Sequence, residues 1–217
     1  MVNRLHIFDC DGVLALSNRL KTHAFDLVAS KYLPRDLVDE FIDFHQTNGG
    51  VSRWDKFEHL LKISKPYILP TIDELSNQFS FIVQNGLNSV APVPGAKKFI
   101  ENLSRKGEVI YVVSGGEQKQ VKKLISILNL RIDMKNIFGS PTRKITHFKN
   151  IRKKYKNFSV MTYGDSALDA KCAYLISSEF TFVTQDSEAS KSEIDRVYPE
   201  KFITITNFLN PKSLINV

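Results

Sequence analysis

Two acidic residues, separated by one position, close an apolar stretch near the N-terminus. Asp9 and Asp11 follow the run HIF and precede Gly12, which lets the chain turn sharply. Residues two apart in an extended strand point to the same side, so both carboxylates would leave the strand end together. Adjacent like charges are tolerated when a cation lies between them and a ligand, and Mg²⁺ prefers such oxygen ligands. Alone the pair is a weak signal, because acids also end strands as solvated turn residues.

Two further polar groups follow apolar segments later in the chain. Ser114, Gly115 and Gly116 come after EVIYVV and before a helical pattern. A hydroxyl, backbone N–H groups and a helix N-terminus could hold a phosphate there. Asp165 and Asp169 lie in GDSALD, after FSVMTY, and could complete a metal site. Each group alone has an ordinary explanation, a turn for the first and a helix N-cap for the second.

A basic residue lies between these two groups. Lys144 is in SPTRK, after the short apolar IFG, where we expect a loop. Its ammonium could offset the charge of a phosphate and of nearby carboxylates. Arg143 and Lys149 are close in sequence and are alternatives for the same role.

The polar groups need elements to position them, and the chain repeats one pattern. Apolar segments typical of strands buried on both faces occur at 4–8, 108–114, 158–165 and 179–184. Helical patterns cover 95–106, 117–128, 145–155 and 166–177. Strands alternating with helices of this length predict right-handed crossovers, and therefore an α/β fold with a doubly wound, Rossmann-like parallel sheet. The carboxyl ends of such strands form the edge where these folds bind ligands.

Residues 15–89 interrupt the alternation. They contain helical periodicities and no convincing strand, and SRWD and TIDE resemble helix starts with capping residues. We predict a helical cap domain over 15–89, inserted into a core domain made of 1–14 and 90–217. The alternation of strands and helices accounts least well for the tail, 185–217.

Composition restricts the function classes. The chain has 217 residues, is 42% hydrophobic and carries a net charge of +7, but its lysines are scattered and not interleaved with aromatic residues. That pattern favours solvated helix faces over a nucleic-acid surface. No signal peptide or membrane span is apparent, and Cys10 and Cys172 are too few for a disulfide scaffold. We expect a soluble, cytoplasmic protein that binds neither nucleic acid nor membranes, as a monomer or homodimer.

Taken in order, the motifs resemble those of the haloacid dehalogenase superfamily. Its four motifs correspond to DCDGV (9–13), VVSGG (112–116), Lys144 and GDSALD (164–169). The segment between the first two is where that superfamily places its helical C1 cap, as in members similar to phosphoglycolate phosphatase and β-phosphoglucomutase. The resemblance therefore implies the same α/β core and a cap at 15–89.

The resemblance also implies roles for the motif residues. Asp9 would be the nucleophile that forms an aspartyl-phosphate, and Asp11 would act as general acid and then general base. Ser114, with Gly115 and Gly116, would hold the phosphoryl oxygens. Superfamily members that cleave carbon–halogen bonds lack an acid at the position of Asp11, so the resemblance implies a phosphatase and not a dehalogenase.

The resemblance assigns the remaining motif residues to metal binding and to charge compensation. Lys144 would neutralise the phosphoryl group and the carboxylates. Asp165 would bind Mg²⁺ together with Asp9 and the backbone carbonyl of Asp11. Asp169 would stabilise the metal ligands or Lys144 without itself binding the metal.

A loop of the expected cap bears on substrate choice. GGVSR, 49–53, is similar to the specificity loop of β-phosphoglucomutase-like members, so Arg53 would contact a second polar group of the substrate. The same similarity raises a phosphosugar mutase as an alternative. Such mutases carry a histidine ten residues after the second aspartate, where this chain has Lys21, with His23 two positions on.

We therefore expect a Mg²⁺-dependent phosphatase that acts on a small phosphorylated metabolite, either a sugar phosphate or a phosphorylated hydroxy acid. A mutase is the first alternative. A catalytically silent binding module is the second, because a fold alone does not fix function.

Overall fold

The protein is described over residues 4–210 by a computed structural model. An all-parallel sheet of six strands, in the order β3-β2-β1-β4-β5-β6, forms its centre. The strands are β1 (Arg4–Phe8), β2 (Val109–Glu117), β3 (Ile137–Ser140), β4 (Ser159–Gly164), β5 (Glu179–Val183) and β6 (Ile203–Ile205). The predicted doubly wound parallel sheet is confirmed. Both ends of the predicted core, 1–3 and 211–217, lie outside the described residues.

One strand was not predicted, and a second lies in the tail segment 201–208, which the sequence marks only as β-rich. β3 is the short IFGS segment before Lys144, and β6 is the ITI segment of the tail, which pairs with β5. Both lie at the edges of the sheet, where a strand has one neighbour and needs fewer apolar residues. Their short length explains why periodicity alone missed them.

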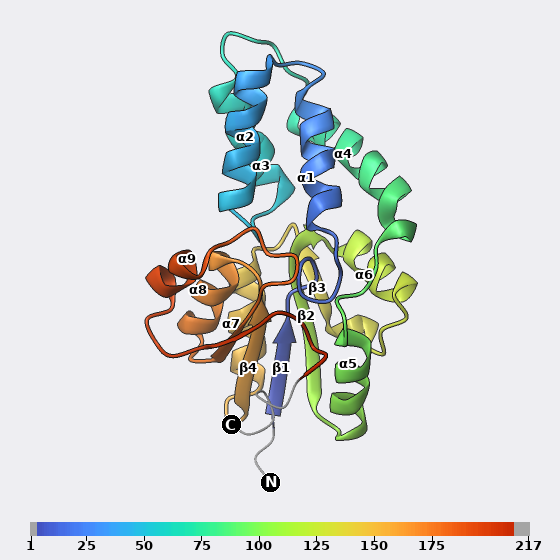
Figure 1. The fold of residues 1–217 in the computed structure, drawn as a ribbon, viewed down its shortest axis with the longest axis vertical. Helices are drawn as coiled ribbons and strands as arrows, with labels where there is room; N and C mark the ends of the chain where they lie inside the picture. The colour runs from blue at the N-terminus through green and yellow to red at the C-terminus, as the bar shows by residue number, and fades with distance from the viewer. Residues whose placement is uncertain (1–3, 211–217) are drawn as a thin grey trace.

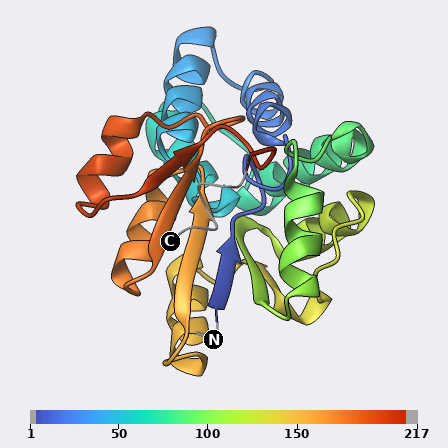
Figure 2. The same cartoon turned by 60° about the horizontal axis from the view of Figure 1, so that its bottom comes forward.

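Helices cover both faces of the sheet (Figures 1 and 2). Phe8 packs in one apolar cluster with α5 and α6, whereas Leu5 and Ile7 pack in a second cluster with α7 and α8. This alternation along β1 buries both faces, as its continuous apolar run predicts. The helices are α5 (Ala96–Arg105), α6 (Gln118–Ile127), α7 (Lys144–Lys154), α8 (Ala167–Leu175) and α9 (Lys191–Val197).

A separate group of helices lies beyond the carboxyl ends of the strands, at the top of Figure 1. We call it the helical insert. It consists of α1 (Asn18–Ala29), α2 (Arg35–Thr47), α3 (Arg53–Ile63) and α4 (Ile72–Gly86). Ser52 and Thr71 cap α3 and α4 through their side chains, as the sequence predicts. Phe25, Phe41 and Phe57 pack against one another inside it.

Within residues 4–210, no helix combines the length and the apolar character that crossing a bilayer would require.

Candidate active site

The predicted polar groups meet at one edge of the sheet. Asp9 follows β1 and Asp165 follows β4, and these two strands are neighbours, as are β1 and β2, which carries Ser114. Parallel pairing brings the carboxyl ends of the three strands side by side. The structure thus brings Asp9, Asp11, Ser114, Lys144, Asp165 and Asp169 into one buried cluster.

Asp9 is held by its neighbours on both sides. Its backbone N–H donates to the carbonyl of Tyr163 at 2.9 Å, and its Oδ1 accepts from the backbone N–H of Cys10 at 2.7 Å. Its Oδ2 lies 3.1 Å from Nζ of Lys144. Burial raises the pKa of Asp9 to about 7, against the opposing charge of Lys144. A cation would therefore favour the ionised, nucleophilic form of Asp9.

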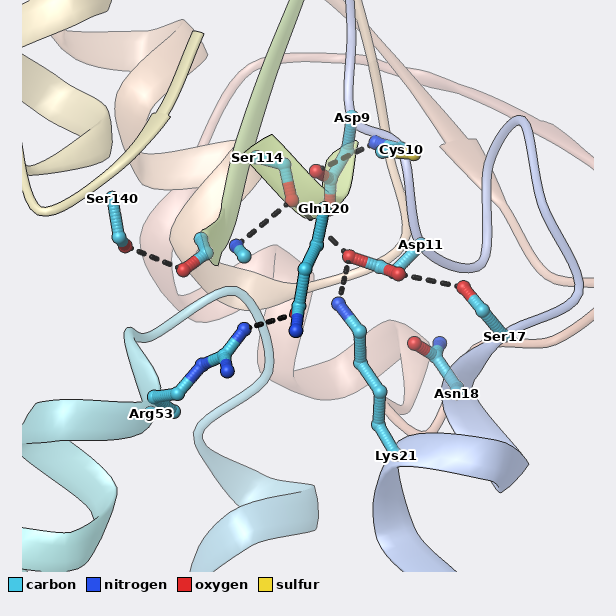
Figure 3. A network of polar contacts seen from close by, with 12 residues as sticks. Asp9, Cys10, Asp11, Ser17, Asn18, Lys21, Arg53, Ser114, Gln120 and Ser140 are labelled. Atoms are coloured by element: carbon cyan, nitrogen blue, oxygen red, sulfur yellow. Dashed lines mark hydrogen bonds and ion pairs between the residues drawn. The ribbon is translucent and has the colours of Figure 1, made fainter. Parts of the chain in front are cut away.

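Asp11 has three donors (Figure 3). Its carboxylate accepts hydrogen bonds from Ser17 at 2.6 Å, Lys21 at 2.5 Å and Ser114 at 3.1 Å. Burial by itself would raise the pKa of Asp11, but the Lys21 charge and these donors outweigh it and lower the pKa. The two acids of the motif thus differ in environment, which is the condition for giving them different chemical roles.

Lys144 connects the two ends of the cluster. Its Nζ donates to Oδ1 of Asp169 at 2.7 Å while contacting Asp9. Burial would lower the pKa of Lys144, but Asp169 and Asp9 raise it above its ordinary value, so the ammonium stays charged. The expectation of a loop here was wrong, because Lys144 is the first residue of α7. A helix start lets the side chain be aimed rigidly at the acids.

The cluster fits a divalent cation. Carboxylate oxygens of Asp9, Asp165 and Asp169 lie within 4.8 Å of one another, all buried. Burial and the neighbouring charges of Asp9 and Asp169 raise the pKa of Asp165 well above its ordinary value. The site holds four acids and two ammonium groups, so one divalent cation would balance its charge. The charged residues counted are Asp9, Asp11, Asp165, Asp169, Lys21 and Lys144.

Glycines allow the close approaches in the site. Gly12 has φ of +74°, and a Cβ there would collide with the carboxylate of Asp165. A Cβ on Gly115 would collide with the carbonyl of Gly50, in the loop between α2 and α3. The insert loop therefore lies directly on the SGG segment at the end of β2.

The insert closes a small cavity, of about 60 Å³, over Asp9 and Asp11. Its insert wall carries three cationic side chains among the described residues, Lys21, Arg53 and Lys56. Figure 3 shows Lys21 reaching from α1 to Asp11, and Arg53 reaching from α3 to Gln120 of the core. Arg53 also donates to Ser80, and its guanidinium lies 3.7 Å from Glu117.

Sequence reasoning missed several polar contacts of the site. Asn18 donates to Oδ2 of Asp165 at 2.7 Å, and Ser187 donates to the backbone carbonyl of Asp165 at 2.6 Å. Lys21 was noticed only as a departure from the mutase pattern. Asn18 and Lys21 are three residues apart at the start of α1, a spacing that places them on one helix face. Nothing in the local sequence marks Ser187.

Comparisons with known proteins agree with this geometry. Residues 6–183 match the family model of the haloacid dehalogenase-like hydrolases. No protein of curated function matches the chain at a significant level.

Solved structures with a similar fold share little sequence with the chain. A hydrolase from Pseudomonas syringae aligns over 99% of this chain and 97% of its own, with a TM-score of 0.76 and 15% identity. A predicted phosphoglycolate phosphatase from Haemophilus somnus aligns over 98% and 97%, with a TM-score of 0.75 and 18% identity. CbbY from Rhodobacter sphaeroides, solved with phosphate, aligns over 98% and 97%, with a TM-score of 0.70 and 15% identity.

At such identities the structural matches show a shared fold, whereas the family model covers most of the chain and includes the strand ends that carry the buried acids. The chain therefore belongs to the haloacid dehalogenase-like hydrolases.

Proposed function

We propose that this hydrolase is a Mg²⁺-dependent phosphatase of small phosphomonoesters, working through an aspartyl-phosphate on Asp9. The observation that carries the proposal is the position of Lys144, which contacts both Asp9 and Asp169 inside a cluster of buried acids. A carboxylate can attack an anionic phosphoryl group only where positive charge offsets the repulsion. Asp9, Asp165 and the backbone carbonyl of Asp11 would hold Mg²⁺, which would supply that charge together with Lys144.

The reaction would proceed in two displacements. In the first, a carboxylate oxygen of Asp9 bonds to phosphorus while the phosphorus–oxygen bond to the leaving group breaks, and Asp11 gives its proton to the leaving oxygen. The approach of an anionic phosphate raises the pKa of Asp11 and so supplies the protonated form. In the second, water attacks phosphorus, Asp11 takes the proton, and Asp9 is released. Ser114 and the Gly115 and Gly116 backbone would hold the phosphoryl oxygens.

Lys21 supports hydrolysis over transfer to a second hydroxyl. It lies at the position where mutases of this family carry a histidine, and its Nζ contacts Asp11 at 2.5 Å. The ammonium keeps Asp11 ionised, as a base must be, and it is the replacement of the mutase histidine by Lys21 that favours water as the acceptor. A β-phosphohexose distinguishes the two reactions, since a mutase would convert it into an isomeric hexose phosphate without releasing phosphate.

The helical insert would act as a cap that admits only small substrates. The cavity beneath it has a volume of about 60 Å³, which is room for few non-hydrogen groups beside the phosphate. Arg53 lines this cavity and would border the organic part of the substrate. Cys10 and Cys172 are both free and buried, in keeping with the cytoplasmic location expected from the sequence.

The proposal is tested by phosphate release from a panel of small phosphomonoesters, with Mg²⁺ and with a chelator. We expect release that depends on Mg²⁺ and is lost in Asp9→Asn. Asp195→Asn, on the exposed side of α9, is the matched control and should retain turnover. Turnover that persists in Asp9→Asn would rule out the covalent mechanism. A folded protein without activity on the whole panel would favour a silent binding module.

A further inference from the structure

The insert wall of the cavity contains one buried cation without an acidic partner. Lys56 on α3 is 3% exposed and lines the cavity above Asp9 and Asp11. No carboxylate of residues 4–210 forms an ion pair with it, whereas Lys21 is paired with Asp11 and Arg53 lies 3.7 Å from Glu117. A buried ammonium that has no ion-pair partner costs folding free energy. Such a group is retained most readily where a ligand supplies the missing charge.

Lys56 is held in place by a chain of hydrogen bonds. Its Nζ lies 2.5 Å from Nδ1 of His45 and 3.0 Å from the His45 carbonyl oxygen. Nε2 of His45 lies 2.9 Å from Oγ1 of Thr22, which donates to Oε1 of Glu188 at 2.7 Å. These hydrogen bonds join α3, α2 and α1 of the insert to the core loop that carries Glu188. The bonds that hold the ammonium lie between α3 and α2 of the insert, and the Thr22–Glu188 bond connects them to the core.

These hydrogen bonds leave one N–H group of Lys56 without an acceptor. An ammonium has three N–H groups, and His45 accepts two of them. His45 is neutral, because burial and then the charges of Lys56 and Lys21 lower its pKa to about 2. The third N–H therefore has no hydrogen-bond acceptor among the described residues; apart from His45, the ammonium lies 5.5 Å from the centroid of the Phe25 ring, which carries no countercharge.

We propose that Lys56 is a specificity-determining residue that binds a carboxylate on the organic part of the substrate, so that this hydrolase prefers phosphorylated hydroxy acids to neutral sugar phosphates. The inference rests on the proposed phosphatase function and names its substrate class. One ammonium with one free N–H fits a carboxylate better than a second phosphate, which proteins bind with several donors or a guanidinium fork. The small cavity also favours a short acid over a hexose.

Binding of an acidic ligand should be accompanied by proton uptake. Burial lowers the pKa of Lys56 to about 7, with Glu188 and the site acids Asp11 and Asp165 opposing this effect and Lys21 adding to it. His45 is the remaining titratable group in contact, and it stays neutral. A carboxylate beside Lys56 raises the pKa of the amine again. At about pH 8, an acidic ligand should therefore bring most of a proton with it, and a neutral ligand should not.

The first experiment compares 2-phosphoglycolate with its neutral analogue 2-hydroxyethyl phosphate. For the unmodified protein we expect kcat/KM to favour the acid by about a hundredfold, and Lys56→Met to remove most of that preference. Lys62→Met, an exposed change on the same helix, should keep it. A preference below about tenfold, or an equal loss for both substrates in Lys56→Met, would overturn the proposal.

The second experiment does not depend on turnover. Binding of the same two compounds to Asp9→Asn with Mg²⁺ is measured by calorimetry, in two buffers that differ in ionisation enthalpy, at about pH 8. Greater proton uptake with the acid than with the analogue, absent from the Asp9→Asn, Lys56→Met double variant, would support the proposal. Equal uptake would overturn it. If the unmodified protein hydrolyses no phosphomonoester, the proposed function fails, while this measurement still decides the role of Lys56.

Discussion

The charged side chains are paired differently on the two walls of the cavity, the core wall formed by the α/β core and the insert wall formed by the helical insert. On the core wall, Lys144 lies 3.1 Å from Asp9 and 2.7 Å from Asp169, and Asp11 accepts three hydrogen bonds. On the insert wall, Lys56 contacts a neutral imidazole, a carbonyl oxygen and the face of the Phe25 ring, and forms no ion pair within residues 4–210. The core wall has an excess of negative charge, which suits a divalent cation, and the cation would then offset the charge of a phosphoryl group. The insert wall has a positive charge left over, which suits the rest of the substrate.

The comparison separates chemistry from selection. Groups that act on phosphorus are positioned by strand ends and by the start of α7, and they are common to any substrate of the class. Groups that select a substrate are positioned by helix packing in the insert, and they can change without disturbing the sheet. The following changes test the separation, from the largest expected effect to the smallest.

Replacing Lys144 should cause the largest loss. We expect Lys144→Met to lower turnover about a thousandfold, because the phosphoryl group and Asp9 lose their shared cation. The free energy of unfolding should fall by about 3 kcal/mol in a chelator, since buried acids are left uncompensated. Urea unfolding measures this loss, with the exposed Lys149→Met as control. Equal stability of the two variants would contradict the account of the core wall.

Replacing Asp165 should remove the stabilising effect of Mg²⁺. Burial and the charges of Asp9 and Asp169 raise the pKa of Asp165, so Asp165→Asn should unfold no more easily than the unmodified protein in a chelator. At a Mg²⁺ concentration 100-fold above Kd, the unmodified protein should gain about 2.7 kcal/mol, and the variant should not. Thermal melts with and without Mg²⁺ provide the measurement. A variant that gains as much would show that the metal lies elsewhere.

Replacing Lys21 should move the pH dependence. The ammonium lowers the pKa of Asp11, so Lys21→Met should raise it. Asp11 must be ionised to accept the proton of water, so the acid limb of the kcat profile should move to higher pH by about one unit. The pH–rate profiles of both proteins measure this shift. A limb that stays in place would mean that Asp11 is not the base that limits turnover.

Replacing Arg53 should have the smallest effect. Its guanidinium contacts Gln120, Ser80 and Glu117, and so links the insert to the core without touching the aspartates of the site. We expect Arg53→Met to raise KM about tenfold and to change kcat little. Steady-state kinetics separates the two constants. A loss in kcat as large as that of Lys144→Met would place Arg53 in the chemistry.

The sequence predicts the core wall better than the insert wall, for a physical reason. Asp9, Ser114 and Asp165 end strands whose apolar runs are readable locally, and parallel pairing then brings them together. Lys56 and His45 belong to ordinary amphipathic helices, and their contact depends on how α2 and α3 pack. Glu188 lies in a loop of the core whose approach to Thr22 no local pattern indicates. The edge strands β3 and β6 escape for a similar reason, being too short for a periodic signal.

The most direct test of the central claim is to look for the phosphoryl group on Asp9. The protein with Mg²⁺ and a small phosphomonoester substrate is quenched in acid during turnover, and its peptides are analysed by mass spectrometry. The account predicts the added mass of one phosphoryl group on the peptide that contains Asp9, and none when Mg²⁺ is removed. A phosphoryl group on another residue, or turnover with Asp9 unmodified at every time point, would contradict it.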